Sequence, residues 1–389
     1  MRAAVDVMGG DKAPAAILKG CWEAAPLLHD GDLVYLVGDE TAVREGLAQS
    51  GLTDAQKSHY KLVATTQVVE MDDAPVEAIR NKPDSSISVM CKLAAKGEAD
   101  VVISAGNTGA CVAAAQLRMR TLPGVSRPGI AVLMPTFYGP VVLCDVGANI
   151  SPQPRHLMQY AIMAGAYATK VCGVENPRVG LLSIGEEDAK GTTVVKEARK
   201  LMRDEPQINF IGNVEGRDLF RGVVDVVVCD GFVGNIVLKF TEGLAEGLFQ
   251  TILAELEEVD PNLLEQFRPV MKTIYHKHDW QEYGGAPLLG VGGYCLICHG
   301  RSDSRAIKNA IRVGKQLATS GINEIVVKGI AASIPGGEER EKCRTPNAEC
   351  RMKERASGFH SAFDIRQSAF VLNYVQLQCH HHRDRKCGA

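Results

Sequence analysis

The sequence predicts an α/β protein with a doubly wound, largely parallel sheet, helices on both faces and a protruding helical hairpin. Two observations carry this prediction. Six short runs rich in β-branched residues each lead into a small polar turn with glycine and then into a helical pattern. A separate stretch, about residues 236–275, has helical periodicity almost throughout. Apolar strands that alternate with helices are typical of a sheet buried on both faces.

The six expected strands differ in sequence, but each is followed by a turn of the same kind. The strands and their turns are 3–7 with 8–12, 101–104 with 105–109, 141–144 with 145–149, 179–182 with 183–190, 226–229 with 230–235, and 294–298 with 299–302. Right-handed crossovers bring the carboxyl ends of parallel strands to one edge, where open α/β sheets bind ligands. We therefore expect the six turns to converge on one cleft.

The helical hairpin is the one segment that does not follow this alternation. Its first half carries apolar residues at helical spacing, including Phe240, Leu244 and Leu248. It breaks at Asp260-Pro261, where aspartate suits an N-cap and proline suits the first helical position. Its apolar residues outnumber what one sheet face needs. Core packing, a dimer interface and a surface that contacts membrane or a partner protein are the three interpretations.

Composition excludes several classes of protein. The 389 residues include 43 Lys and Arg against 46 Asp and Glu, a net charge of −3, so a nucleic-acid-binding protein is not indicated. No run of about 18 apolar residues is present that would span a membrane. The first ten residues lack the apolar segment of a signal peptide. We expect a cytoplasmic protein.

The chain divides at about residue 335 into an α/β domain, 1–335, and an atypical tail, 336–389. The tail carries ten Lys and Arg against seven Asp and Glu, a local charge of +3 that leaves −6 for the rest. It holds four of the 12 cysteines and four of the ten histidines. We expect a poorly ordered extension, with a metal-binding appendage at Cys379 to His382 as the alternative. The other cysteines, Cys295 and Cys298 among them, we expect to be reduced core residues.

Familiar catalytic motifs do not occur in the turns. The turn 105–109 lacks the Lys-Ser/Thr ending of a P-loop, and no G-x-G-x-x-G follows the first strand. No G-x-S-x-G or H-E-x-x-H motif is present. Backbone N–H groups at helix N-termini remain, and these suit a small anion such as phosphate. Lys12, Lys190, Arg301 and Lys308 are nearby counter-charges.

An ordered set of short motifs resembles the bacterial phosphate acyltransferase family, the acyl-[acyl-carrier-protein]:phosphate transacylases of phospholipid synthesis. The motifs are DVMGGD at 6–11, DSSI at 84–87, SAGNTGA at 104–110, DVGAN at 145–149, IGEE at 184–187 with Lys190-Gly191, DGFVGN at 230–235, and EYGGAPLLG at 282–290 with His299-Gly300. The resemblance runs from about residue 1 to about 333. Departures from the family pattern include Ser183, Gly292, Arg301 and Asp303.

This resemblance implies a reaction in which inorganic phosphate attacks the thioester of an acyl carrier protein and yields an acyl phosphate. It implies no cofactor and no metal. It also implies a cytoplasmic homodimer that associates peripherally with the membrane surface, where a glycerol-3-phosphate acyltransferase uses the product.

The resemblance and the turn chemistry together name the candidate site residues. Lys190, as the cation for phosphate, and His299, as proton shuttle or hydrogen-bond donor, are the predicted catalytic residues. The predicted substrate-binding residues are Gly10, Asn107, Thr108, Asp145, Asn149, Asn235 and Ser302. Amides of the turn 106–109 and the side chains of Asn107 and Asn149 are candidate donors to the developing oxyanion.

Three other functions stand against the leading one. The first is transfer of short acyl groups from coenzyme A to phosphate. The second is a non-enzymatic scaffold at the membrane surface, which the apolar hairpin and the unfamiliar residues at 301 and 303 would suit. The third is a metal- and NAD-dependent decarboxylating dehydrogenase, for which the sequence lacks clustered arginines and aspartates.

Overall fold

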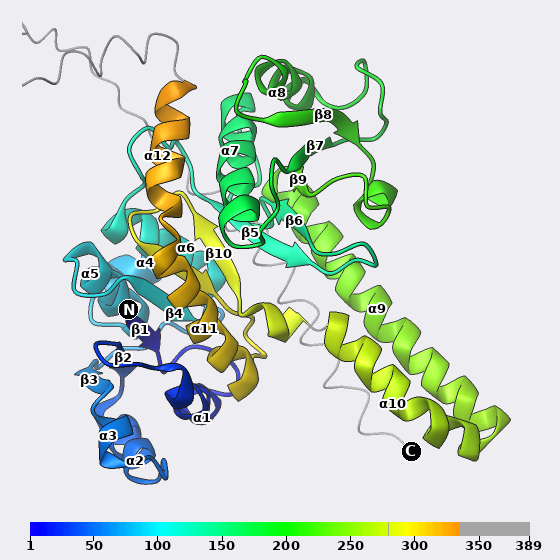
Figure 1. The fold of residues 1–389 in the computed structure, drawn as a ribbon. Coiled ribbons are helices and arrows are strands. Elements are labelled where there is room, and N and C mark those ends of the chain that lie inside the picture. The colour runs from blue at the N-terminus through cyan, green and yellow to red at the C-terminus, as the bar shows by residue number, and fades with distance from the viewer. Residues whose placement is uncertain (279, 334–389) are drawn as a thin grey trace, which may run out of the picture.

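The computed structural model describes residues 1–278 and 280–333 of the chain. The predicted tail, with its four cysteines and its candidate metal site, lies outside the described residues. Within them, one sheet of 11 strands has helices on both faces (Figure 1). The predicted fold class is therefore confirmed.

All six expected strands are present, and five more join them. The strands are β1 (Arg2–Asp6), β2 (Leu33–Gly38), β3 (Tyr60–Ala64), β4 (Val101–Ser104), β5 (Gly129–Met134), β6 (Val141–Cys144), β7 (Arg178–Leu182), β8 (Asn209–Val214), β9 (Val226–Val228), β10 (Ala286–Leu289) and β11 (Tyr294–Ile297). Their order in the sheet is β3-β2-β1-β4-β11-β10-β5-β6-β9-β7-β8.

The sheet consists of two parallel blocks. Block one is β3-β2-β1-β4-β11, and block two is β6-β9-β7-β8. Between them, β10 is antiparallel to β11 and β5, and β5 is antiparallel to β6. The blocks therefore run in opposite directions. The expectation that all six turns share one edge is wrong, because the antiparallel β10 and β5 reverse the strand direction halfway across the sheet.

The helices and helical turns follow the strands. They are α1 (Ala15–Glu23), η1 (Ala25–Leu27), α2 (Glu40–Ala48), α3 (Asp54–Lys57), α4 (Pro75–Asn81), α5 (Ser86–Ala95), α6 (Thr108–Ala114), η2 (Ala115–Met119), α7 (Pro154–Lys170), α8 (Thr193–Arg203), η3 (Gly216–Phe220), α9 (Gly231–Val259), α10 (Pro261–His278), η4 (Trp280–Tyr283), α11 (Ser304–Ser320) and α12 (Ile322–Ala332).

The core lies on both faces of the sheet, as continuously apolar strands require. In β1, Val5 faces a cluster that includes α1, α7, α11 and α12, whereas Ala4 faces α4, α5 and α6. Cys298 and Cys295 likewise belong to opposite clusters, and both are buried. The described cysteines are all free thiols, as expected. Their burial is the behaviour of small apolar side chains.

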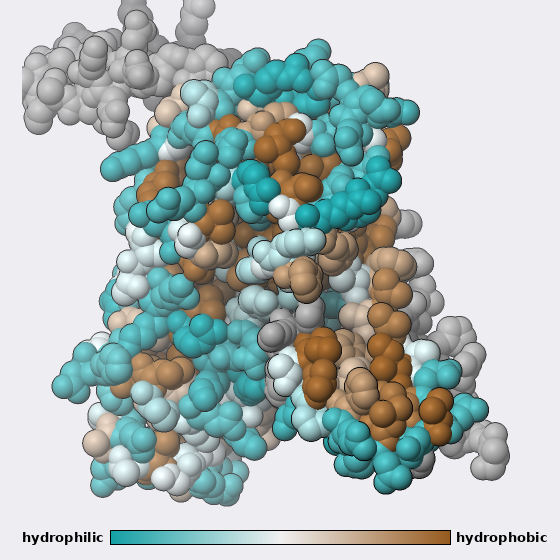
Figure 2. Space-filling model, turned by 45° about the vertical axis from the view of Figure 1, so that its right-hand side comes forward, coloured by the Kyte–Doolittle hydropathy of each residue, from teal (hydrophilic) through white to brown (hydrophobic). Residues whose placement is uncertain are grey.

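The hairpin projects away from the body of the molecule (Figure 1). Its helices, α9 and α10, meet at Asp260, where the sequence predicted the break. Asp260 accepts a hydrogen bond from the backbone N–H of Asn262 at 2.9 Å. Along α9 the side chains of Phe240, Leu244 and Leu248 are 67, 58 and 57% exposed. Figure 2 shows apolar residues gathered on this hairpin. Core packing therefore does not account for its apolar stripe.

Among the described helices, none is both long enough and apolar enough to cross a membrane.

Candidate active site

The turns after β1, β4 and β11 form one compact group at the carboxyl edge of block one. The backbone N–H of Asp11 donates to the carbonyl of Gly300 at 2.8 Å. Gly10 has a φ of +108°, and an added Cβ would lie 3.1 Å from the carbonyl oxygens of Ala105 and Gly300. A Cβ on Gly9 would lie 2.7 Å from the nitrogen of Gly106. Glycine is therefore required where these three turns touch.

A buried carboxylate joins the turns after β1 and β4. Asp6, 1% exposed at the end of β1, accepts hydrogen bonds from Ser104 Oγ at 2.7 Å and from the N–H of Met8 at 3.1 Å. Burial raises the pKa of Asp6, and hydrogen bonds from Ser86 and Ser104 oppose that shift. Sequence reasoning assigned Asp6 no role. The available signal was an acidic residue at the end of an apolar strand.

Asn107 caps α6 and is fully engaged with backbone groups. Its Oδ1 accepts from the N–H of Ala110 at 3.0 Å, and its Nδ2 lies 3.1 to 3.2 Å from the carbonyl oxygens of Glu70, Met71 and Asp73. The side-chain amide therefore has no hydrogen left for an oxyanion. Its role in this structure is to tie the segment 70–73 to the turn after β4.

Two other predicted residues of this group differ in exposure. Thr108, the first residue of α6, is exposed. Ser302 is 1% exposed, and its Oγ has no hydrogen-bond partner within the described part of the chain. The N–H of Ser302 donates to the carbonyl of His299 at 2.9 Å, which closes the turn after β11.

His299 is a neutral imidazole with a defined tautomer. Burial, followed by the charges of Lys239 and Arg301, lowers its pKa to about 4. The N–H of Arg301 donates to His299 Nδ1 at 3.1 Å. Because Nδ1 accepts, the ring proton lies on Nε2. His299 therefore carries an N–H donor on its other ring nitrogen.

The turn after β6 forms a second group, in block two, around Asp145. This carboxylate is 0% exposed and accepts from the N–H groups of Ile130, Gly147, Ala148 and Asn149 at 2.7 to 3.2 Å. Burial raises the pKa of Asp145 to about 6, and the backbone hydrogen bonds oppose the shift. In this structure Asp145 organises the backbone of its own turn.

Asn149 is also occupied by the protein. Its Nδ2 donates to the carbonyl of Pro128 at 2.7 Å and contacts Tyr160 Oη at 2.8 Å. Its carbonyl accepts from the N–H of Gly231 at 2.8 Å, which joins the turn to the start of α9. Its amide nitrogen, like that of Asn107, is not available to an oxyanion.

The first turns of α9 connect the two groups. Asp230 caps the helix, because its Oδ1 accepts a hydrogen bond from the backbone N–H of Val233 at 2.9 Å. Lys239, two turns further along, is close enough to His299 to lower its pKa, and its ammonium group pairs with Glu242 at 2.8 Å. Asn235 lies four residues before Lys239 and so shares its helix face. Asn235 is half-buried, and no hydrogen bond engages its side chain within residues 1–278 and 280–333. Sequence reasoning missed Lys239, which no motif marks.

Lys190 lies on the loop between β7 and α8 in block two. It is exposed, and its N–H donates to the carbonyl of Glu187 at 3.0 Å. In the described chain its ammonium group forms no ion pair. None of the contacts above joins it to His299.

A second neutral histidine, missed by sequence reasoning, lies in block two. Burial, then the charges of Arg127 and Arg155, lowers the pKa of His156 to about 4. The N–H of Gln153 donates to its Nδ1 at 3.0 Å, so Nε2 carries the proton. Each block therefore carries a neutral histidine among cationic side chains, His299 on the turn after β11 and His156 in the first turn of α7.

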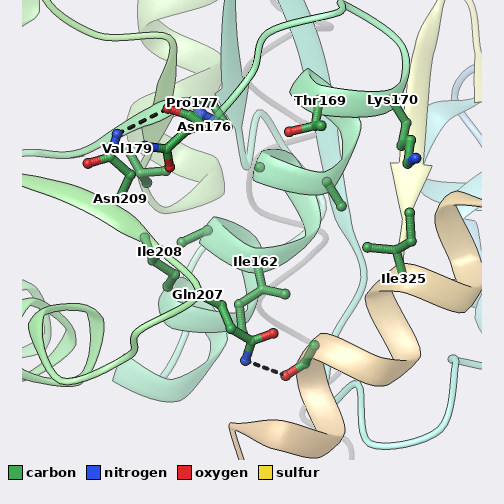
Figure 3. A pocket seen from close by; sticks show the side chains of 14 residues that line it. Ile162, Thr169, Lys170, Asn176, Pro177, Val179, Gln207, Ile208, Asn209 and Ile325 are labelled. Carbon is green, nitrogen blue, oxygen red and sulfur yellow. Dashed lines mark hydrogen bonds between the residues drawn. The ribbon is translucent and has the colours of Figure 1, made fainter.

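A pocket of about 260 Å³ lies elsewhere, between α7, α12 and the first residues of β7 and β8 (Figure 3). It is lined by Ile162, Val179, Ile208 and Ile325, and Gln207 crosses its edge to donate to the carbonyl of Gly329 at 3.1 Å. None of the predicted site residues lines it. Among the described residues, no cluster of three or more His, Cys, Asp or Glu could hold a metal ion.

Comparisons with known proteins agree on one family. A family model described as "Fatty acid synthesis protein" matches residues 1–325. A phosphate acyltransferase of Heliobacterium modesticaldum is 45% identical over 341 residues, which cover 87% of this chain and 99% of that protein. One of Desulfitobacterium hafniense (strain DSM 10664 / DCB-2) is 46% identical over 332 residues, covering 84% and 97%.

The fold is also similar to solved structures of lower identity. The EutD phosphotransacetylase from Staphylococcus aureus superposes with a TM-score of 0.54 at 17% identity, covering 82% of this chain and 94% of that one. A phosphotransacetylase from Streptococcus pyogenes gives the same values. At this identity the likeness concerns the fold alone.

Proposed function

The chain belongs to the family of fatty acid synthesis proteins and is an acyltransferase, as its relatives named phosphate acyltransferase are; from this premise we propose that it transfers a fatty acyl group from an acyl carrier protein to inorganic phosphate. The product is an acyl phosphate for phospholipid synthesis. The observation that carries the proposal is the neutral His299, with its Nε2–H, beside the cationic Lys239.

The reaction needs charge compensation more than it needs a protein nucleophile. A phosphate oxygen attacks the carbonyl carbon of the thioester, the C–S bond breaks, and the carrier thiol leaves as a thiolate. Phosphate is already an anion, so positioning dominates. Burial raises the pKa of the thiols nearest to this group of turns, Cys111 and Cys298, which makes them poor nucleophiles.

We assign the roles as follows. His299 donates its Nε2–H to the oxyanion that develops on the thioester carbonyl, and it stays neutral throughout the physiological range. Lys190 offsets the charge of the phosphate, and Lys239, which pairs with Glu242, adds positive charge beside His299. Asn235 orients one of the reactants from the same helix face as Lys239. Asn107, Asp145 and Asn149 hold the turns, because their polar atoms already bind backbone groups.

Gly10, Thr108 and Ser302 complete the proposed binding surface in block one. Gly10 lets three turns touch, which brings the backbone of these turns together. Thr108 is exposed at the start of α6, and Ser302 has an Oγ without a partner among the described residues. Either hydroxyl can donate to a phosphate oxygen.

The acyl-transfer assay tests the proposal directly. Full-length protein, a long-chain acyl carrier protein and phosphate should yield an acyl phosphate, which hydroxylamine traps as a hydroxamate. Trapping that does not depend on phosphate contradicts the proposal. Comparison with short-chain coenzyme A thioesters in the same assay decides between the two acyl donors.

The scaffold hypothesis predicts a different outcome for two variants. Lys190→Ala and His299→Ala should each abolish most phosphate-dependent trapping if the protein is an enzyme. A scaffold at the membrane surface would retain its function when both side chains are lost.

We propose that the hairpin carries the protein to the membrane surface, where its product is consumed by a glycerol-3-phosphate acyltransferase. The exposed apolar residues of the hairpin support this, since they continue from α9 to Val259, 73% exposed, and Phe267, 44% exposed. Apolar helical faces of this kind bind the lipid interface in proportion to the area that they bury. A second copy of the chain, in a homodimer, is the other occupant that this surface suits.

Liposome sedimentation separates these two occupants. Leu263→Asp and Phe267→Asp should reduce sedimentation while the mass in solution stays unchanged. Leu201→Asp, at an exposed leucine of α8, is the matched control. Unchanged sedimentation with an intact dimer would contradict the membrane role.

A further inference from the structure

The loop that carries Lys190 is held by contacts with neighbouring elements rather than by contacts within the loop. Residues 186–190 are exposed, and within the loop the N–H of Lys190 donates to the carbonyl of Glu187 at 3.0 Å. At its start, the N–H of Ser183 donates to the carbonyl of Val214 at 2.9 Å. A short exposed loop with so few internal bonds needs outside contacts to keep one conformation.

One such contact comes from β8. Asn213, 7% exposed, donates from Nδ2 to the carbonyl of Glu187 at 3.1 Å. This is the same carbonyl that accepts from the N–H of Lys190. Asn213 therefore fixes the turn that ends at the lysine.

The stronger contact comes from α8. Asp188 forms ion pairs with Arg199 and with Arg203, the latter at 3.1 Å. The arginines are four residues apart and so lie on one face of the helix. The Arg199 side chain is 8% exposed, whereas that of Asp188 is 68% exposed. A buried guanidinium needs a charged partner, so Arg199 draws Asp188, and with it the loop, against the helix.

The other polar groups around this loop contribute few hydrogen bonds beyond the ion pairs of Asp188. Ser183 Oγ, Asn213 Oδ1 and Arg199 Nε are buried and have no hydrogen-bond partner within the described chain. The hydrogen bonds beneath the loop are thus incomplete, and the ion pairs with Asp188 are its main polar attachment.

The ion pairs also keep the Asp188 carboxylate from pairing with Lys190. Asp188 is two residues from Lys190 and, without a partner of its own, would compete for the lysine's ammonium group. In the described chain no ion pair joins Lys190 to Glu186, Glu187 or Asp188. Two arginines neutralise Asp188, so this carboxylate does not compete with an anionic ligand for Lys190.

We infer that Asp188 with Arg199 and Arg203 forms a latch that positions Lys190 for phosphate, which makes Arg199 and Asp188 positioning residues for the acyl transfer. This inference rests on the proposed function. Without the latch the loop loses its attachment to α8, and where the arginines are the residues lost, Asp188 also becomes free to pair with Lys190. Both effects weaken phosphate binding and leave the acyl donor's site unchanged.

The test is a double-mutant cycle. Asp188→Asn should lower kcat/KM for phosphate by about 10- to 100-fold and leave the KM for the acyl donor unchanged. In a Lys190→Ala background the same substitution should have almost no further effect, because the residue that it positions is gone. Glu197→Gln, the same kind of change at an exposed position of α8, is the control. Asp188→Glu, which keeps the charge, should recover part of the loss.

Hydrogen exchange of the amides of 185–190, measured on the same proteins, makes the outcome independent of turnover. Faster exchange in Asp188→Asn, with an effect on kcat/KM that disappears in Lys190→Ala, supports the latch. Unchanged exchange overturns it. Faster exchange with an equal loss in both backgrounds means that the ion pairs only stabilise the loop, and this overturns the positioning role. If the wild-type protein forms no acyl phosphate, the proposed function is refuted instead. If exchange is still faster in Asp188→Asn than in that wild type, the ion pairs stabilise the loop without a role in acyl transfer.

Discussion

The two blocks of the sheet each carry a neutral histidine with nearly the same local chemistry. His299 follows β11 in block one, and His156 follows β6 in block two. Each accepts a backbone hydrogen bond at Nδ1, at 3.1 and 3.0 Å, and each has a pKa lowered to about 4 by burial and two cationic residues.

Their surroundings differ. In the block that carries His156, the polar groups of Asn149 and Asp145 are engaged with backbone and with Tyr160. On the side of His299, one turn of α9 presents Lys239, and the same helix face carries Asn235, whose side chain no hydrogen bond engages in the described chain. A lowered histidine pKa therefore identifies burial only. The charged and polar side chains beside the ring identify the candidate chemistry.

We expect the largest effect from a substitution in the contact between α9 and the turn after β6. In Gly234→Ala the new Cβ would lie 2.0 Å from the backbone oxygen of Asp145 and 2.8 Å from Cys229 Sγ. Backbone must move to relieve this, so we expect a loss of more than about 3 kcal/mol in the free energy of unfolding. Urea denaturation measures it.

The same helix offers a matched control. A Cβ on Gly247 meets no atom within 4 Å. Gly247→Ala should therefore stabilise the protein by about 0.5 to 1 kcal/mol through helix propensity. Equal effects at 234 and 247 would contradict the close packing of α9 on the turn after β6.

The second prediction separates the two histidines by activity. His299→Ala should lower kcat for acyl transfer by about 100-fold or more, because it removes a preorganised donor. His156→Ala should change kcat by less than about threefold, because the polar groups of the turn after β6 are engaged with the protein. Steady-state kinetics on both variants measures this. A larger loss at position 156 would place the chemistry in block two.

The third prediction concerns the carboxylate that organises block two. Asp145→Asn replaces an acceptor of four backbone N–H groups with an amide whose NH₂ cannot accept. We expect a loss of about 2 to 4 kcal/mol in the free energy of unfolding. Asp204→Asn, at an exposed position after α8, is the control and should change stability by less than about 0.5 kcal/mol.

The smallest effect is the pH dependence of stability. The pKa of each histidine is about 4 in the folded protein, below the ordinary 6.5, so its contribution is present above pH 6.5 and is lost as pH falls towards 4. The pKa of Asp145, about 6, is above the ordinary 3.8, so its contribution has the opposite sign and is lost as pH rises through 6.

Acid titration of stability checks these signs. Each histidine should contribute about 1 to 2 kcal/mol between pH 6.5 and 4, after allowance for partial exposure. The variant that carries both His156→Gln and His299→Gln should lose less stability on acidification than the wild type. Loss of Asp145 should make the acid loss steeper. An unchanged slope in the double variant would mean that the two rings are accessible to solvent.

Much of the sheet could be predicted from sequence because its signals are local. The six strand runs, the glycine turns that follow them and the break at Asp260 depend on neighbouring residues and on backbone geometry. The two-sided burial of β1 follows from its continuous apolar run. Even so, β5 and β10 were not among the expected strands, and these two reverse the strand direction between the blocks.

The predicted site was only partly a matter of local pattern. The motifs identified the turns. They did not show that the side-chain amide nitrogens of Asn107 and Asn149 donate hydrogen bonds to backbone carbonyls. They also missed Lys239, His156 and the buried Asp6, because each acquires its role from elements far away in the sequence.

The sequence by itself determined the fold class, the family and the polar turns, because strand burial, helix periodicity and glycine geometry are encoded over a few residues. Only the tertiary structure decided which polar groups remain available, because a hydrogen bond to a distant backbone carbonyl occupies a donor that the sequence shows as free. The charge around His299 was decided in the same way, through a lysine on α9, 60 positions earlier in the chain.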